Sequence, residues 1–150
     1  MKPKLISAIV WAGLLAGTLD IIAACGVFNI RTGQDPIIVL RYVASGALGA
    51  SAMTGGWATA LLGLFFHFVI AFGWTTLFFL VLPKLPKGSW IIYGLLYGIV
   101  VWLAMNLAVL PVTRITMRPF TWDGVLIGAT VLMFAIGLPV SYISHKHYDR

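Results

Sequence analysis

Residues 57–82 read WATALLGLFFHFVIAFGWTTLFFLVL and contain one ionisable side chain, His67. At 1.5 Å per residue, about 20 apolar residues in a helix cross the roughly 30 Å hydrocarbon layer of a membrane. The stretch does not alternate apolar and polar residues as a barrel strand would. Because only helices and closed barrels satisfy their backbone hydrogen bonds in lipid, it predicts a membrane-spanning α-helix.

Three further stretches have the same character, namely residues 5–27, 88–112 and 124–144, and Asp20 is the one charged residue in them. With residues 57–82, they predict an all-α integral membrane protein, a four-helix bundle. Charged residues make up 9% of the chain, whereas a soluble domain has about 25%. We therefore expect residues 1–150 to form a single transmembrane domain without a separate soluble part.

The first apolar stretch also has features of a secretory signal. Lys2 and Lys4 precede it, and residues 22–25, Ile-Ala-Ala-Cys, resemble a lipoprotein cleavage box. The stretch is, however, longer than the core of a usual signal, and Asp20 lies just before the box. We therefore expect a membrane span rather than a cleaved leader. Cys25 is the single cysteine, so an intrachain disulfide is excluded.

The segment between the first two spans contains a second helix. No charged residue occurs from Tyr42 to Pro83, and one helix over this stretch would be about 63 Å long, too long for a bilayer. The small residues of 44–56 mark where the stretch breaks. We predict a short helix at residues 36–52, beginning at Pro36, which lies at the membrane interface or re-enters the membrane.

The positive charges predict the orientation. With a cytoplasmic N-terminus, the cytoplasmic side holds Lys2, Lys4, Lys84, Lys87, Lys146 and Arg150, and the opposite side holds Arg31, Arg41, Arg114 and Arg118. The positive-inside rule then favours both termini in the cytoplasm, with the protein in the inner (plasma) membrane. The net charge of +6 follows the span ends rather than forming a patch, so we expect membrane lipids, and no nucleic acid, as partners.

Glycines recur at four-residue spacing in three of the spans, as Gly13/Gly17, Gly94/Gly98 and Gly124/Gly128. Such pairs let helix backbones approach closely where lipid supplies no hydrophobic driving force. We interpret them as packing contacts within the bundle. A contact between two copies, giving a homo-oligomer, is the alternative.

Three polar residues within the spans, Asp20, His67 and Asn106, share helix faces with small residues and should point into the bundle. An ionisable group at membrane depth is costly and indicates a functional site. Together with Arg41 and Arg114, these residues predict a polar ligand-binding pocket that opens away from the cytoplasm. Three interpretations remain open: a structural hydrogen-bond cluster, a ligand or ion site, and proton-coupled chemistry.

Catalytic and metal sites are not expected. The chain has no glutamate, no glycine-rich phosphate loop and no nucleophile elbow. His67 is the one histidine within a span, and His145 and His147 lie in a tail that we expect to be solvated, without further ligands. We therefore predict a non-enzymatic protein without a metal or cofactor.

Short motifs along most of the chain resemble a family of small bacterial four-span inner-membrane proteins and, more distantly, the YagU-type proteins. They are Ala44-Ser-Gly46, Gly55-Gly56, Ala60-Leu-Leu-Gly63 with His67, Gly94-Leu-Leu-Tyr-Gly98, Met105-Asn106 and Val109-Leu-Pro111. The resemblance implies the four-span topology and points to His67 and Asn106, but it implies no substrate. We expect the protein to bind or pass a small molecule, ion or lipid. The alternative is a structural or partner-binding membrane subunit.

Overall fold

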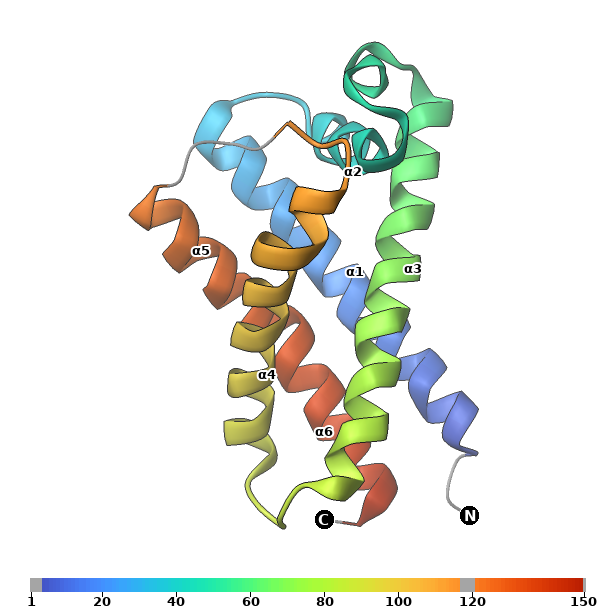
Figure 1. Ribbon diagram of the computed structural model, residues 1–150, viewed down its shortest axis with the longest axis vertical. Helices are drawn as coiled ribbons and strands as arrows, with labels where there is room; N and C mark the ends of the chain where they lie inside the picture. Colours follow the sequence, from blue (N-terminus) through green and yellow to red (C-terminus); the bar gives the residue numbers. More distant parts are fainter. Residues whose placement is uncertain (1–3, 117–120, 150) are drawn as a thin grey trace.

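The computed structural model describes residues 4–116 and 121–149, and within them the protein is all-α, as predicted (Figure 1). The α-helices are α1 (Leu5–Thr32), α2 (Ile37–Leu48), α3 (Trp57–Val81), α4 (Trp90–Ala104), α5 (Trp122–Leu132) and α6 (Leu138–Tyr148). Short 3-10 turns cover Ala50–Thr54, Leu82–Lys84 and Leu110–Val112. Two π-helical turns, Met105–Val109 and Met133–Gly137, extend α4 and join α5 to α6.

Four helical segments are long and apolar enough to cross a membrane: Leu5–Thr32, Trp57–Lys84, Trp90–Val112 and Trp122–Tyr148. Their outer faces carry large exposed apolar side chains, such as Trp11, Leu61 and Leu126. Such a surface suits lipid rather than water, because a monomeric soluble protein rarely exposes a large continuous apolar patch. The fold is therefore that of a multi-pass membrane protein with a shorter helix between its first two spans.

The ends of two spans differ from the boundaries expected from the sequence. α1 continues past residue 27 to Thr32 and ends at Gly33, whose φ of 67° and N–H bond to the Asn29 carbonyl form a left-handed cap. α6 continues to Tyr148, and His145 is only 3% exposed. The prediction of a solvated histidine tail is therefore wrong for His145, which packs inside the end of the bundle.

The short helix α2 lies at the end of the bundle opposite both termini (Figure 1). The Asp35 side chain accepts a hydrogen bond from the Ile37 N–H at 2.9 Å, which stabilises its first turn, and Gly49, with φ of 76°, follows its last turn. α2 packs on α3 at Gly63, where a Cβ would overlap the Leu40 carbonyl oxygen. This glycine is what allows the two backbones to come so close.

A second close approach joins α4 to the last span. A Cβ at Gly98 would overlap the Met133 backbone, and one at Gly137 would overlap the Gly94 carbonyl oxygen. In lipid, such backbone proximity stabilises a bundle through dispersion contacts rather than through the hydrophobic effect. Nearer the termini, the large buried side chains Phe78, Phe79, Leu82 and Val140 fill the space between the spans.

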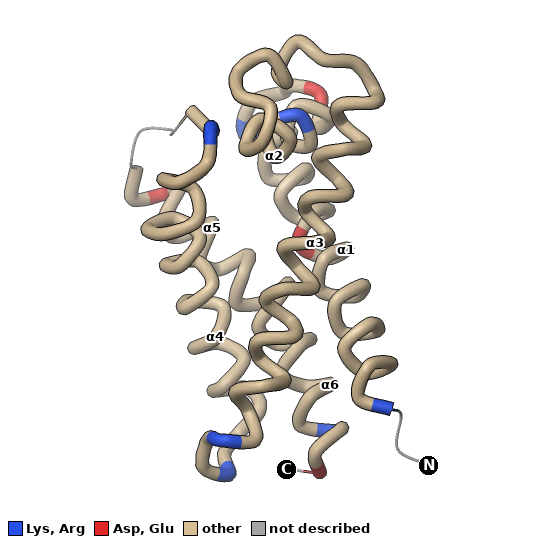
Figure 2. Tube along the Cα trace, turned by 45° about the vertical axis from the view of Figure 1, so that its right-hand side comes forward, with Lys and Arg blue, Asp and Glu red and all other residues tan. Residues whose placement is uncertain are grey.

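Among the described residues, the lysines and the arginines lie at opposite ends of the bundle. Figure 2 shows lysine and arginine at the two ends of the bundle, with the long helices between them almost free of charge. The end that carries the termini holds Lys4, Lys84, Lys87 and Lys146, and we refer to it as the lysine end. The opposite end, beside α2, holds Arg31, Arg41 and Arg114 and is referred to as the arginine end.

Candidate functional site

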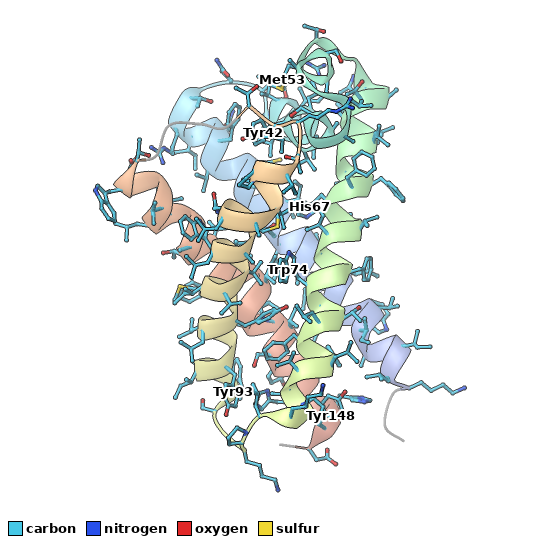
Figure 3. All side chains as sticks on the ribbon, viewed as in Figure 1. Tyr42, Met53, His67, Trp74, Tyr93 and Tyr148 are labelled. Atoms are coloured by element: carbon cyan, nitrogen blue, oxygen red, sulfur yellow. The ribbon has the colours of Figure 1, made fainter. Side chains whose placement is uncertain are left out.

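A cleft of about 410 Å³ lies in the arginine half of the bundle and receives side chains from every span. Its volume falls within the range of about 300–1,000 Å³ that is common for small-molecule sites. The lining is mostly apolar, with these residues contributing: Asp20, Tyr42, Val43, Gly46, Ala47, Phe66, His67, Val69, Ile70, Ala71, Trp74, Val101, Met105, Val109, Leu110, Thr113, Ile115, Leu132 and Ile136. Figure 3 shows Tyr42 of α2 above His67 and Trp74, which follow one another down α3.

The cleft opens on the side of the bundle. Val69, near the middle of α3, lines the cleft and is 53% exposed, and Ala47 of α2 is also an exposed lining residue. The middle of a span faces acyl chains, so the part of the cleft at Val69 is on the lipid-facing side, whereas α2, which carries Ala47, lies at the arginine end.

The cleft ends at a layer of aromatic side chains on its lysine side. The Tyr97 hydroxyl donates to the Trp74 carbonyl at 2.6 Å, and the Trp74 indole N–H lies 3.3 Å from Met105 Sδ. The rings of Tyr97 and Phe78 pack edge to face, with centroids 4.6 Å apart. Since buried Phe79 and Leu82 follow directly behind this layer, the cleft is closed toward the lysine end.

Asp20 and His67 meet at the wall of this cleft. His67 Nε2 lies 2.8 Å from the Gly17 carbonyl oxygen, and Nδ1 lies 4.0 Å from Asp20 Oδ2. The side chains are 11% exposed for His67 and 16% for Asp20. At 1.5 Å per residue, Asp20 lies about 18 Å along α1 from Thr32, so the pair sits deep in the membrane span. The expected proximity of these two residues is therefore present in the structure.

The contact with Gly17 determines which nitrogen of His67 carries a hydrogen. A backbone carbonyl only accepts hydrogen bonds, so Nε2 must be the donor. Nδ1 is then the ring nitrogen that faces Asp20. Close packing holds this arrangement, because a Cβ at Gly17 would lie 3.2 Å from the Ala71 Cβ and against the Phe68 ring.

The other three predicted site residues lie elsewhere. The Asn106 amide donates to the Trp102 carbonyl of its own helix at 2.9 Å, within the π-helical turn. The buried Nε of Arg41 has no hydrogen-bond partner among the described residues. Arg114 is exposed, and its backbone N–H donates to the Gly46 carbonyl at 3.0 Å. None of these three residues is among those lining the cleft, which is consequently more apolar than the predicted pocket.

Several residues that shape the cleft were not among the predicted site residues. Tyr42, Phe66, Trp74 and Met105 supply its aromatic and sulfur-containing walls. Phe66 and Trp74 lie within an apolar span, where an aromatic side chain reads equally well as packing or lipid contact, so its role in a cleft does not stand out from the sequence. Tyr42 could have been recognised from the sequence, because it is a polar aromatic residue just before the small residues of 44–56.

A second cavity, of about 500 Å³, lies between α1, α2 and α5 and is bordered by Arg31, Thr32, Tyr42 and Gly124. Arg31 forms an exposed ion pair with Asp123, which joins the end of α1 to the start of α5. Exposed ion pairs of this kind contribute about 0–1 kcal/mol. The charges of Arg31 and Asp123 therefore compensate each other beside this cavity.

The buried histidine at the lysine end forms a separate polar group. His145 Nδ1 lies 2.9 Å from the Ser141 carbonyl, and the Ser141 hydroxyl donates to the Trp90 carbonyl at 2.7 Å. The His145 ring packs against Tyr93, with centroids 5.8 Å apart. The Ser141 hydrogen bond and the ring contact of His145 with Tyr93 fasten α6 to α4.

Within the described residues, no group of three or more His, Cys, Asp or Glu side chains is arranged to hold a metal ion.

The comparisons with known proteins do not extend this description. No family model, no curated protein and no solved structure matches the chain. The resemblance to small four-span proteins stays a prediction, and the interpretation of the site depends on its own geometry.

Proposed function

We propose that this protein binds a small, mainly apolar molecule that enters the cleft sideways from the membrane. The observation behind the proposal is that Asp20 and His67 face a cleft whose other walls are mostly apolar. Ligand sites commonly combine apolar walls with a few polar groups that orient the ligand. An ionisable residue at membrane depth is in addition a functional-site hypothesis by default.

The shape of the cleft fits a role in binding a molecule better than a role in passing one across the membrane. A conduit needs an opening at each side of the membrane, whereas the aromatic layer at Trp74 and Tyr97 closes the cleft toward the lysine end. Among the described residues that line the cleft, no nucleophile has an adjacent base in hydrogen-bond reach, as covalent catalysis requires. We therefore propose a non-enzymatic binding role, in the inner membrane with both termini in the cytoplasm.

The test uses a small neutral photoreactive probe, a trifluoromethyl-phenyldiazirine, added to the protein in liposomes. After illumination, mass spectrometry locates the labelled residues. We expect saturable labelling of residues that line the cleft, such as Phe66, Ile70 and Met105, above a uniform background on the lipid-facing surface. The substitution Ala47→Phe, at an exposed lining position, should fill the mouth and suppress the saturable part.

Ala58→Phe serves as the matched control, since Ala58 is exposed at the start of α3 and does not line the cleft. It should leave the labelling unchanged. Uniform, non-saturable labelling that Ala47→Phe does not alter would refute the binding role. It would favour the alternative, a structural or partner-binding subunit.

A further inference from the structure

The charge inside the cleft restricts which ligand it can hold. The titratable groups that line the cleft are Asp20 from α1, His67 from α3 and the Tyr42 phenol from α2. Among the described residues, α4, residues 113–115 and the last span contribute no titratable side chain to the lining. Arg41 and Arg114 lie outside it. Of the described residues that line the cleft, Asp20 is therefore the single one with a carboxyl group.

The carboxylate is also incompletely satisfied within the protein. Among the described residues, no hydrogen bond is donated to Asp20, and its ion-pair partner, His67 Nδ1, lies 4.0 Å away, beyond hydrogen-bond distance. An unpaired charge at this depth costs about 3 kcal/mol or more, so the carboxylate requires a compensating positive charge or a proton. One proton held by the pair would supply that compensation, because a carboxyl group and an imidazole that share one proton carry no net charge.

The walls beside the pair suit an organic cation. Tyr42, Phe66 and Trp74 line the cleft with aromatic rings. The faces of aromatic rings attract positive charge, most strongly when the cation is desolvated. An apolar cleft with aromatic walls and one carboxylate is complementary to a positively charged molecule with apolar substituents, and it is not complementary to an anion.

We propose that the cleft binds a lipophilic organic cation, such as a quaternary ammonium or phosphonium ion, in exchange for one proton. This inference rests on the proposed binding function and specifies its ligand class. In the exchange, the cation enters beside the Asp20 carboxylate, and the shared proton leaves His67 Nδ1 or the carboxyl group for bulk water. The net charge of the occupied site stays the same, because one positive charge replaces another.

The exchange predicts a definite pH dependence. A proton that must leave competes with the cation, so the affinity rises with pH by about tenfold per unit over the range in which the ligand-free pair holds its proton. Above that range, the carboxylate is already free and the affinity levels off. A ligand that binds without proton release shows no such slope.

The experiment compares two probes of the same shape and opposite charge, tetraphenylphosphonium and tetraphenylborate. Purified full-length protein is titrated with each in one detergent at a constant micelle concentration. Isothermal titration calorimetry in two buffers of different ionisation enthalpy then counts the protons released. We expect the phosphonium ion to bind more tightly than the borate, with close to one proton released per cation.

The substitution Asp20→Asn should weaken phosphonium binding about 30-fold or more, which is typical when one member of a buried charge pair is removed. Asp123→Asn is the matched control, since Asp123 is exposed and lies outside the cleft; it should leave binding unchanged. Thermal unfolding in the same detergent verifies that both variants are folded.

Equal binding of the two probes, release of no proton, or unchanged affinity in Asp20→Asn would each overturn the exchange. The neutral diazirine experiment separates this failure from that of the proposed function. If the neutral probe still labels the cleft saturably, the binding role stands and only the cation and proton assignment is lost. If that labelling is also absent, the binding role itself fails.

Discussion

The His67 side chain, which belongs to α3, makes two polar contacts with α1. Its Nε2 donates to the Gly17 carbonyl of α1, while Nδ1 faces Asp20 on the same helix. The carbonyl thereby determines the tautomer, and the tautomer determines which nitrogen faces the carboxylate. An interhelical hydrogen bond and the proposed ligand site thus share His67.

The two roles of His67 can be separated by substitution. His67→Ala removes the interhelical hydrogen bond and should lower the free energy of unfolding by about 0.6–1.7 kcal/mol, the range measured for such bonds in membranes. His67→Gln should recover much of that loss, because an amide N–H can donate to the Gly17 carbonyl. Reversible unfolding in mixed micelles measures both. Equal destabilisation by the two substitutions would contradict a bonding role for Nε2.

At the scale of the element, α2 depends on one glycine of its neighbour. α2 is twelve residues long, about 18 Å, too short to span the hydrocarbon layer. It is positioned by packing on α3 at Gly63, where the two backbones touch. Because Tyr42, Gly46 and Ala47 of α2 line the cleft, this packing also determines the shape of the candidate site.

Gly63→Ala should therefore displace α2 and destabilise the protein. The added Cβ meets the Leu40 carbonyl, and backbone cannot move aside as a flexible side chain can. Overpacking of this kind costs about 1–3 kcal/mol, which thermal unfolding in detergent will detect. Labelling of the cleft by the neutral probe should fall in the same variant.

Gly73→Ala is the control on the same helix, since a Cβ there meets no atom within 4 Å. It should be neutral or stabilising, because alanine favours the helical conformation over glycine by about 1 kcal/mol. Similar destabilisation by the two alanines would show that helix propensity, rather than contact with α2, explains the effect.

For the whole molecule, the arrangement separates a filled half from a half that contains cavities. Large buried side chains occupy the lysine half, where His145 also packs. Both cavities lie toward the arginine end, beneath and beside α2. If the positive-inside rule applies, the filled half faces the cytoplasm and the cleft lies in the outer half of the membrane.

Cysteine labelling tests this orientation. In a Cys25→Ser background, single cysteines replacing Gln34 or Thr116 at the arginine end should react with a membrane-impermeant maleimide added to intact cells. A cysteine replacing Pro86 at the lysine end should react only after the cells are lysed. All three positions are exposed in the structure, so access to the reagent depends on membrane side alone. The reverse pattern would invert the orientation.

The sequence by itself determined the fold class. Length, apolar character and the scarcity of charge require spanning helices, because lipid leaves the backbone no other way to satisfy its hydrogen bonds. The break within residues 44–56 followed from the same reasoning, since one uncharged helix from Tyr42 to Pro83 would exceed the membrane thickness. The pairing of Asp20 with His67 was also within reach, as both share faces with small residues that pack.

Only the tertiary structure decided which polar residues share the site. Periodicity places a side chain on a face of its own helix, but it does not say how far neighbouring helices approach or where a π-helical turn rotates the face. The turn at Met105–Val109 leaves Asn106 bonded to its own helix, while Met105 and Val109 line the cleft. Backbone contacts at Gly63 and Gly98 determine the helix positions, and these packing distances decide where the cleft forms.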